Sequence, residues 1–389
     1  MIARNSAGWR GGMVLLLILL FAGSEALAQG CRIGFDLGST GVRVGSATHP
    51  EQAKVAIDYL ADIRANHAID RTIEPTIEAL TTLPKVANLP ADCTAVAGGY
   101  SAWRLALREA SPARLAATLR TIHERTHVAL FIIPQDVEGN YGYLAAKSLL
   151  GAALKTPFIL DLGGGSMQIA GATSGWGSDL GQKSWHDLFC KQIQGNSDPV
   201  CPANPVGGKA PGRAATLLAP QVAAAKAALG TGLTLTAVTP PVVNAVHPVV
   251  RFLAETHRGV TTAVDAQGFS HAALVQAIAQ LATRDNAAIT ELLDGCREQT
   301  GQPICAPRLL PMLVTDMLLL HAFMDGLGIA RLEVAAAGIN NVPGILADPR
   351  AAAWAGHYPC YLQKLAEIGG EAFKADPRAC GPESGVDRP

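Results

Sequence analysis

Two short turns in this sequence combine a carboxylate, glycines and hydroxyls directly behind an apolar run. The first lies in 33-IGFDLGSTGVRVG-45 and the second in 159-ILDLGGGSMQIA-170. Small residues let consecutive backbone N–H groups approach an anion closely, so such a turn can form an anion-binding nest. The carboxylates of Asp36 and Asp161 would repel a phosphate, so they fit this chemistry only with a divalent cation between. Together the turns predict a metal–phosphate clamp in a cleft.

Either turn alone is more typical of a plain strand connection. Both occur in the same strand–turn–strand setting, which favours one shared site over two unrelated turns. In that site Asp36 and Asp161 would hold Mg²⁺ or another divalent cation. The residues expected to bind phosphate are Gly38, Ser39, Thr40, Arg43, Gly163, Gly164, Gly165 and Ser166.

A hydrolytic site also needs a base for the attacking water. Glu138, in 133-IPQDVEGNYGYLAAKSLLG-151, follows a predicted strand and precedes a predicted helix. Because an acid near a helix N-terminus is favourable whatever else it does, helix capping is its alternative role. Asp136 is a weaker rival for the role of base.

Four basic side chains could extend the contacts to an anion. Arg43 and Arg104 could contact phosphate oxygens, since a guanidinium presents several N–H donors to them. Lys183 and Lys209 could meet a polyanionic chain. For each of the four the alternative is an ordinary solvated surface position.

The surrounding pattern alternates strands and helices, which is typical of an α/β fold. The unit at 32–47, a strand, a glycine turn and a second strand, recurs at 158–172. This internal repeat predicts two related lobes, residues 31–155 and 156–350, followed by a tail at 351–389. Further strands are predicted at 93–99, 128–134, 233–238 and 331–338, and helices at 53–83, 101–124, 141–154, 214–229, 271–294, 309–328 and 352–372.

Residues 1–28 have the pattern of a secretory signal peptide. Arg4 and Arg10 precede the apolar run 13-MVLLLILLFAG-23, and the small residues at 26–28 suggest cleavage before Gln29. A retained membrane anchor is the alternative, although the run is too short to span a bilayer comfortably. The expected location is periplasmic or secreted.

The composition limits the classes of protein that remain. Apolar residues make up 49% and charged residues 16%, which indicates a well-cored globular protein. The net charge of −1 offers no global field for nucleic acid, so no nucleic-acid partner is expected. After signal removal no stable membrane span is expected, because the apolar run 309–328 contains Pro311, Asp316 and His321 and therefore predicts a buried helix.

All eight cysteines follow the signal segment, and their even number in an exported chain favours disulfides. The plausible pairs are Cys31–Cys93, Cys190–Cys201, Cys296–Cys305 and Cys360–Cys380. A zinc site is the competing interpretation. No C-x-x-C spacing or His–Cys cluster in the sequence supports it.

The segments DLGSTGVR, EGNYGYLAAKSLLG and DLGGGSMQI, in that order and spacing, resemble the phosphate-binding and catalytic motifs of the actin/hexokinase-type ATPase superfamily. Within it, the chain resembles two families of phosphoanhydride hydrolases. The motifs are most similar to the nucleoside triphosphate diphosphohydrolases (apyrases). Residues 311–346 are more similar to the exopolyphosphatase/guanosine pentaphosphate phosphatase (Ppx/GppA) family. The resemblance covers roughly 31–346 and implies two ribonuclease H-like lobes around a central cleft.

This resemblance also implies roles for individual residues. Glu138 would activate the water, Ser166 would help to hold it, and Asp36 and Asp161 would hold the metal through waters. The sequence departs from the Ppx/GppA pattern at Val137, where that family commonly has a second acid, and at 238-VTPPV-242, where it usually has a glycine turn.

These observations predict an exported, Mg²⁺-dependent hydrolase of phosphoanhydride bonds, with polyphosphate as the favoured substrate. An apyrase-like nucleoside tri- or diphosphate hydrolase is the alternative. Aromatic residues make up only 5% of the chain, which disfavours strong nucleobase specificity. A non-catalytic phosphate or nucleotide sensor on the same fold is a further possibility from another functional class.

Overall fold

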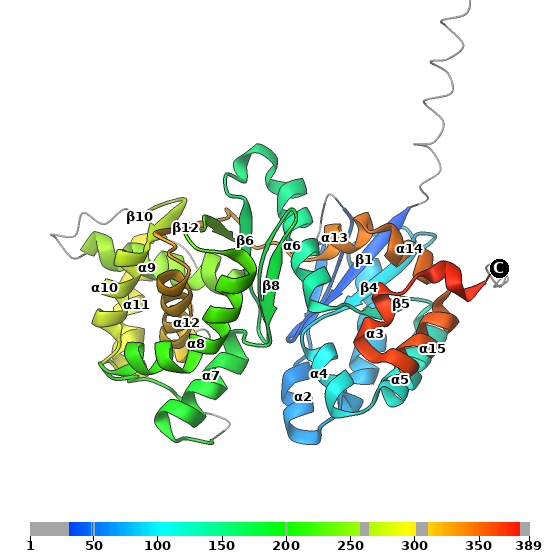
Figure 1. The fold of residues 1–389 in the computed structure, drawn as a ribbon, viewed down its shortest axis with the longest axis horizontal. Helices are drawn as coiled ribbons and strands as arrows, with labels where there is room; N and C mark the ends of the chain where they lie inside the picture. Colours follow the sequence, from blue (N-terminus) through cyan, green and yellow to red (C-terminus); the bar gives the residue numbers. More distant parts are fainter. Residues whose placement is uncertain are drawn as a thin grey trace, which may run out of the picture.

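The computed structural model describes residues 31–47, 49, 51–198, 201–256, 264–300 and 310–381. Side chains are described for these residues except 295–300 and 310. The predicted signal peptide at 1–28 lies outside the described residues. Figure 1 shows two lobes side by side, each with a central sheet and helices packed around it. The predicted α/β class is confirmed.

The first lobe contains a five-stranded sheet in the order β3-β2-β1-β4-β5. β1, β2 and β3 form an antiparallel meander, whereas β4 and β5 run parallel to β1. Parallel strands end at the same edge, so the turn after β1 and the segments after β4 and β5 meet there. The bounds are β1 Arg32–Leu37, β2 Gly41–Gly45, β3 Ala53–Ala56, β4 Thr94–Gly99 and β5 Ala129–Ile132.

The second lobe repeats this arrangement in five of its seven strands. Its order is β10-β11-β12-β9-β6-β7-β8, so β8-β7-β6-β9-β12 corresponds to β3-β2-β1-β4-β5. Again the hairpin is antiparallel and the following strands are parallel. The predicted internal repeat is therefore present in the fold. The bounds are β6 Phe158–Leu162, β7 Met167–Gly171, β8 Gly175–Ser178, β9 Leu235–Ala237, β10 Val264–Asp265, β11 Gly268–Ser270 and β12 Arg331–Val334.

The helices surround both sheets. In the first lobe they are α2 Tyr59–Asn66, α3 Ile73–Val86, α4 Ala102–Glu109 and α5 Pro112–Thr126. α6 is Gln135–Leu150. In the second lobe they are α7 Gln182–Phe189, α8 Ala210–Leu229, α9 His247–Thr256, α10 His271–Leu281, α11 Asn286–Thr300 and α12 Leu310–Gly326, and the C-terminal helices are α13 Val342–Ala347, α14 Pro349–Gly356 and α15 Tyr358–Ile368.

Several predicted helices differ from the structure at their starts; the helix predicted at 214–229, for example, begins at Ala210. Residues 53–56, predicted as helix, form strand β3, because they pair with β2 and extend the meander. The helix predicted at 141–154 begins at Gln135 instead, directly after Pro134. Proline already lacks an N–H, so it suits a helix start. Glu138 therefore lies inside the first helical turn and not before it.

The chain passes between the lobes twice, and both passages border the space between them. α6 follows β5 of the first lobe but packs on β6, β7 and β8 of the second, where Ala145, Ala146, Ile159 and Ala170 form a small shared core. The return passage leads from β12 to α13, which packs against α6 and β1. Figure 1 shows α6 between the lobes.

The C-terminal helices belong to the core of the first lobe, which differs from the predicted boundary at residue 350 and the tail at 351–389. Trp354 and Phe373 are fully buried there. The Tyr361 hydroxyl accepts the Ile132 N–H at 2.8 Å, and the Tyr358 hydroxyl donates to the Leu130 carbonyl at 2.8 Å. These contacts satisfy the open edge of β5, which would otherwise present unpaired backbone groups.

Three of the four expected disulfides are present: Cys31–Cys93, Cys190–Cys201 and Cys360–Cys380. Cys31 and Cys93 meet because they precede the parallel strands β1 and β4. The fourth expected pair, Cys296–Cys305, lies outside the described side chains. Among the described residues, none of the helices combines the length and apolarity that a bilayer crossing requires.

Candidate active site

A cavity of about 280 Å³ lies between the lobes, where the turns after β1 and β6 face each other. Its walls come from both strand ends and from both passages between the lobes. Of the residues predicted for the metal–phosphate clamp and the base, all except Gly165 line it, namely Asp36, Gly38, Ser39, Thr40, Arg43, Glu138, Asp161, Gly163, Gly164 and Ser166. The fold thus brings together residues that are up to 130 positions apart in the sequence.

The first turn is closed by a hydrogen bond from the Gly38 N–H to the Gly41 carbonyl at 3.0 Å. Asp36, at its base, is buried, and its Oδ2 accepts the Asn341 N–H at 3.0 Å. Arg43 Nη1 lies 3.8 Å from Asp36 Oδ1, while its Nε donates to Glu51 at 3.0 Å. Arg43 is therefore held at the rim of the cavity between two carboxylates.

The second turn is closed in the same way, with the Gly163 N–H donating to the Ser166 carbonyl at 2.9 Å. The first residues of α7 anchor it, since the Gln182 and Lys183 N–H groups donate to the carbonyls of Gly163 and Gly164 at 2.8 and 2.7 Å. The Gly163 and Gly164 carbonyls are engaged by α7 and the Gly163 N–H closes the turn, so the Gly164 N–H is a donor left for the cavity.

Gly165 is the predicted phosphate-binding residue that the structure does not place in the cavity wall. It lies where the two turns approach each other, and a Cβ at this position would stand 2.5 Å from Ser101 Oγ and 3.0 Å from Ser39 Oγ. A real Cβ does not tolerate contacts below about 3 Å, so a larger residue would require these serine side chains to move. The effect of Gly165 is to let the two lobes close at the turns.

Glu138 is buried and lies in a network that the fold assembles around its carboxylate. Arg104 Nη1 lies 2.6 Å from Glu138 Oε2 and also donates to the Ile133 carbonyl at 3.0 Å. Gln168 Nε2 donates to Glu138 Oε2 at 3.0 Å and lies 3.2 Å from Ser166 Oγ. Gln168 thereby connects the predicted base to the predicted water-holding serine.

The structure does not support the predicted contact between Arg104 and a phosphate oxygen. Arg104 lies behind Glu138, is buried, and is absent from the cavity wall.

Lys183 pairs with Asp58 of the first lobe at 2.7 Å and so connects the lobes. Lys209 is exposed and is also absent from the wall. Asp136, the rival base, points away and pairs with Lys374 at 3.0 Å.

Three buried carboxylates share this site, and burial raises the pKa of each. The pKa of Asp161 is raised to about 8, first by burial and then by the charges of Glu138 and Asp36. Burial likewise raises the pKa of Asp36, against the lowering effect of Arg43. Burial also raises the pKa of Glu138, and Arg104 opposes it. Such a cluster favours either protonation or a bound cation.

The oxygen atoms around Asp161 fit a hard divalent cation. No hydrogen bond or ion pair to the Asp161 side chain is present in the described part of the chain. Asn341 Oδ1, in the same wall, is buried without a hydrogen-bond partner among the described residues. A Cβ at Gly142 would lie 3.6 Å from Asn341 Oδ1 and 3.8 Å from Asp161 Oδ2, so both oxygens border the space beside Gly142. Oxygen donors of this kind suit Mg²⁺.

Several members of the site were not predicted from the sequence. Gln168 could have been identified from the local sequence, because it lies two residues after Ser166 and alternate residues of a strand lie on the same face. Ser101, which accepts the Ser39 hydroxyl at 2.9 Å, follows β4 and was recognisable only as a strand-end residue. Nothing in the neighbouring sequence indicated Asn341, because the passage from β12 to α13 brings it to the site.

Comparison with solved structures places this architecture. A Ppx/GppA protein from Aquifex aeolicus matches with a TM-score of 0.56 at 14% identity, over 81% of this chain and 95% of that one. An exopolyphosphatase from Cytophaga hutchinsonii matches with a TM-score of 0.54 at 12% identity, over 81% and 96%. The chain has the Ppx/GppA fold. An exopolyphosphatase-like protein agrees, with a TM-score of 0.55 at 16% identity, over 82% and 98%.

These identities show the fold alone. No family model matches the sequence. Among curated proteins, an uncharacterized protein of Streptomyces coelicolor is 38% identical over 74 residues, which are 19% of this chain and 22% of that protein. The match thus spans about a fifth of that protein's length.

Proposed function

We propose that this protein is an exported, divalent-metal-dependent hydrolase that releases phosphate from inorganic polyphosphate. The observation that carries the proposal is the convergence of Asp36, Asp161 and Glu138 in one cavity with the two glycine-hydroxyl turns. The Ppx/GppA fold supports phosphoanhydride chemistry, and the three disulfides support an oxidising compartment.

In this proposal the turns bind the terminal phosphate. Gly164 and Thr40 line the cavity from opposite lobes, so the Gly164 N–H and the Thr40 hydroxyl would hold the phosphate oxygens from two sides. Arg43 at the rim would contact the next phosphate group. Positioning and electrostatics supply most of the catalysis of phosphoryl transfer, which suits a site made of backbone donors.

Glu138 would accept a proton from water. Gln168 Nε2 holds Glu138 Oε2 and lies within 3.2 Å of Ser166 Oγ, so carboxylate and hydroxyl border the same space. A water between them could transfer a proton to Glu138 while its oxygen attacks the terminal phosphorus in line. Arg104 favours the ionised carboxylate that this step requires.

Asp36 and Asp161 would hold the cation, directly or through waters, with Asn341 Oδ1 as a further oxygen bordering the space beside Gly142. When bound, the cation would neutralise charge on the phosphate oxygens and on the two aspartates. Without it, two buried carboxylates would face an anionic substrate.

Polyphosphate is preferred over a nucleotide because the cavity wall offers little to a base. Among the described residues that line it, Tyr100 is the one aromatic side chain, and it is almost completely buried. Stacking on an exposed aromatic face is a common way to recognise a nucleobase. The rest of the wall is made of small, polar and charged residues, two prolines, Leu162 and Ile339.

The test is phosphate release by the purified protein from polyphosphate, ATP, ADP and guanosine tetraphosphate, each with Mg²⁺ and with a chelator. We expect release from polyphosphate above the others, loss of activity with chelator, and recovery with added Mg²⁺. Release of phosphate mainly from nucleotides would support the apyrase alternative. Binding without release from any substrate would support the sensor.

Glu138→Gln tests the assignment of the base within that assay. We expect its turnover to fall by about 10³-fold, within the range for a general base, while substrate affinity stays close to that of the unchanged protein. Asp136→Asn is the matched control, since this acid lies in the same helical turn but outside the cavity. Full activity in Glu138→Gln, or loss only in Asp136→Asn, would contradict the assignment.

A further inference from the structure

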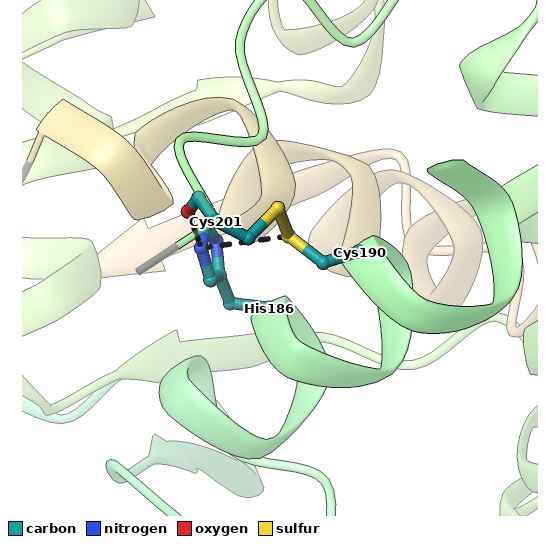
Figure 2. Close-up of side chains that lie close together, drawn as sticks. All are labelled: His186, Cys190 and Cys201. Atoms are coloured by element: carbon teal, nitrogen blue, oxygen red, sulfur yellow. Dashed lines mark hydrogen bonds between the residues drawn. A yellow bond between two sulfur atoms is a disulfide. The ribbon is translucent and has the colours of Figure 1, made fainter. Parts of the chain in front are cut away.

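A second group of chemically active side chains lies in the second lobe, one helical turn beyond the residues of α7 that anchor the phosphate turn. His186 projects from α7, Cys190 begins the π-helical turn η3 (Cys190–Gln194), and Cys201 follows the loop after it. All three are buried, and their ligand atoms lie within 4.8 Å of one another. Figure 2 shows the imidazole facing the disulfide between the two cysteines. No His–Cys cluster was expected from the sequence. In 186-HDLFC-190, however, the histidine and the cysteine have the i, i+4 spacing that places them on one helix face.

The distances in this cluster are close to those of a tetrahedral zinc site. With Zn–N near 2.0–2.1 Å and Zn–S near 2.3 Å, adjacent N and S ligands are separated by about 3.6 Å. His186 Nε2 lies 3.8 Å from Cys190 Sγ. Two thiolates around zinc are separated by about 3.8 Å. Bonded sulfurs are about 2.0 Å apart, so breaking the disulfide and separating them by roughly 1.8 Å would complete the geometry.

The imidazole is held in an orientation that suits a metal ligand. The Thr315 hydroxyl donates to the Met312 carbonyl at 2.8 Å, so its oxygen is left to accept from His186 Nδ1, 3.3 Å away. In the oxidised chain His186 Nε2 donates to the Cys201 carbonyl at 3.0 Å. A metal on Nε2 would replace this hydrogen bond, and the ring proton would then lie on Nδ1, facing the Thr315 hydroxyl oxygen. Metal-bound histidines commonly donate their other N–H to such a fixed acceptor.

We propose that reduction of the Cys190–Cys201 disulfide converts this cluster into a zinc site. Its ligands are the two thiolates and His186 Nε2. Gln194 Oε1, 3.4 Å from Cys201 Sγ, or a water takes the fourth position. A thiol or phosphine reductant supplies two electrons, the S–S bond breaks, and two protons complete the thiols. Binding of Zn²⁺ then releases those two protons to the solvent.

Charge favours a divalent cation among the metals that thiolates bind, and the mixed sulfur and nitrogen ligands favour Zn²⁺. Two thiolates, a neutral imidazole and Zn²⁺ together carry no net charge, which a buried site can accept without a counter-ion. The other two disulfides present, Cys31–Cys93 and Cys360–Cys380, belong to no such group of three ligands within the described side chains. The site is therefore specific to one of the disulfides.

The experiment measures zinc bound per chain, by elemental analysis after gel filtration, for oxidised and phosphine-reduced protein in excess Mg²⁺. The excess magnesium would compete with zinc for the proposed oxygen ligands between the lobes. We expect one additional zinc per chain after reduction. Co²⁺ in place of Zn²⁺ should give thiolate-to-metal charge-transfer absorption in the reduced protein alone.

Two variants locate the metal. His186→Gln keeps the disulfide, so its oxidised fold can be checked by thermal unfolding, and we expect at least a tenfold loss of zinc affinity after reduction. The double variant Cys360→Ser, Cys380→Ser removes a disulfide that belongs to no group of three metal ligands among the described side chains, and we expect it to bind zinc like the unchanged chain. A reduced chain that takes up no additional zinc overturns the proposal. Unchanged affinity in His186→Gln also overturns it, because the metal would then be held by cysteines elsewhere or by an unfolded chain.

Discussion

The two glycine turns share a sequence pattern, but their aspartates are compensated very differently. Asp36 in the first turn has a backbone N–H from Asn341 at 3.0 Å and a guanidinium from Arg43 at 3.8 Å. Asp161 in the second turn has no hydrogen bond or ion pair among the described residues, and its pKa is raised to about 8. Related turns in the two lobes have therefore acquired unequal electrostatics.

This difference indicates different roles for the two turns. The Asp36 carboxylate of the first turn has two partners, Asn341 and Arg43, which suits a rigid part of the phosphate clamp. The second turn keeps an uncompensated carboxylate beside Glu138, which destabilises the empty site and leaves free ligand capacity for a cation. Functional sites commonly accept such a cost in stability.

The largest effect on activity is expected when either aspartate is exchanged for asparagine. Both Asp161→Asn and Asp36→Asn should lose about 10²-fold or more in phosphate release, since each removes a charged ligand from the proposed cation site. With chelator present, Asp161→Asn should be more stable than the unchanged protein near pH 8. Asp36→Asn should gain less, because its carboxylate already has two partners.

The pH dependence of stability separates these effects. Because the pKa of Asp161 is higher in the folded chain than its unfolded value of 3.8, the carboxyl costs stability progressively as pH rises from about 4 to about 8. The limiting slope is about 1.4 kcal/mol per pH unit. Thermal unfolding of both variants in chelator at several pH values checks this. An equal gain in the two variants would contradict the proposed asymmetry.

Alanine at single glycines tests how closely the turns approach each other. Gly165→Ala should destabilise the protein by about 1–3 kcal/mol, because its Cβ would stand 2.5 Å from Ser101 Oγ across the lobes. Gly163→Ala is the matched control, since its Cβ would meet nothing closer than 3.4 Å. Denaturant unfolding measures both, and equal destabilisation would mean that the turns are not packed as closely as described.

The smallest effect is expected from the charge behind the base. Arg104→Gln removes a guanidinium that lowers the pKa of Glu138, so that pKa should rise. A general base acts only when ionised, so activity is lost as pH falls through its pKa, and the acidic limb of the kcat profile should move to higher pH. The rate on the plateau should change much less than in Glu138→Gln. An acidic limb that does not move would show that Glu138 does not govern it.

Much of this arrangement was predictable from local sequence. The strand–turn–strand units at 32–47 and 158–172 are present, because small turn residues between apolar runs specify a hairpin largely by themselves. The cysteine pairs followed from spacing and parity. Strand β3 was missed because 53-AKVA-56 is exposed and only its pairing with β2 makes it a strand.

The sequence by itself determined the repeated turn chemistry, the position of Glu138 after a strand, and the α/β class, since each depends on residues within about one element of each other. Tertiary structure alone decided which charges are compensated. It placed Arg104 against Glu138 and outside the cavity wall, and left Asp161 without a hydrogen-bond or ion-pair partner among the described residues. It also brought the C-terminal helices back onto the first lobe and placed His186 beside a disulfide. The physical reason is that burial and charge pairing depend on segments far apart in the chain, whereas a hairpin or a helix start depends on neighbours.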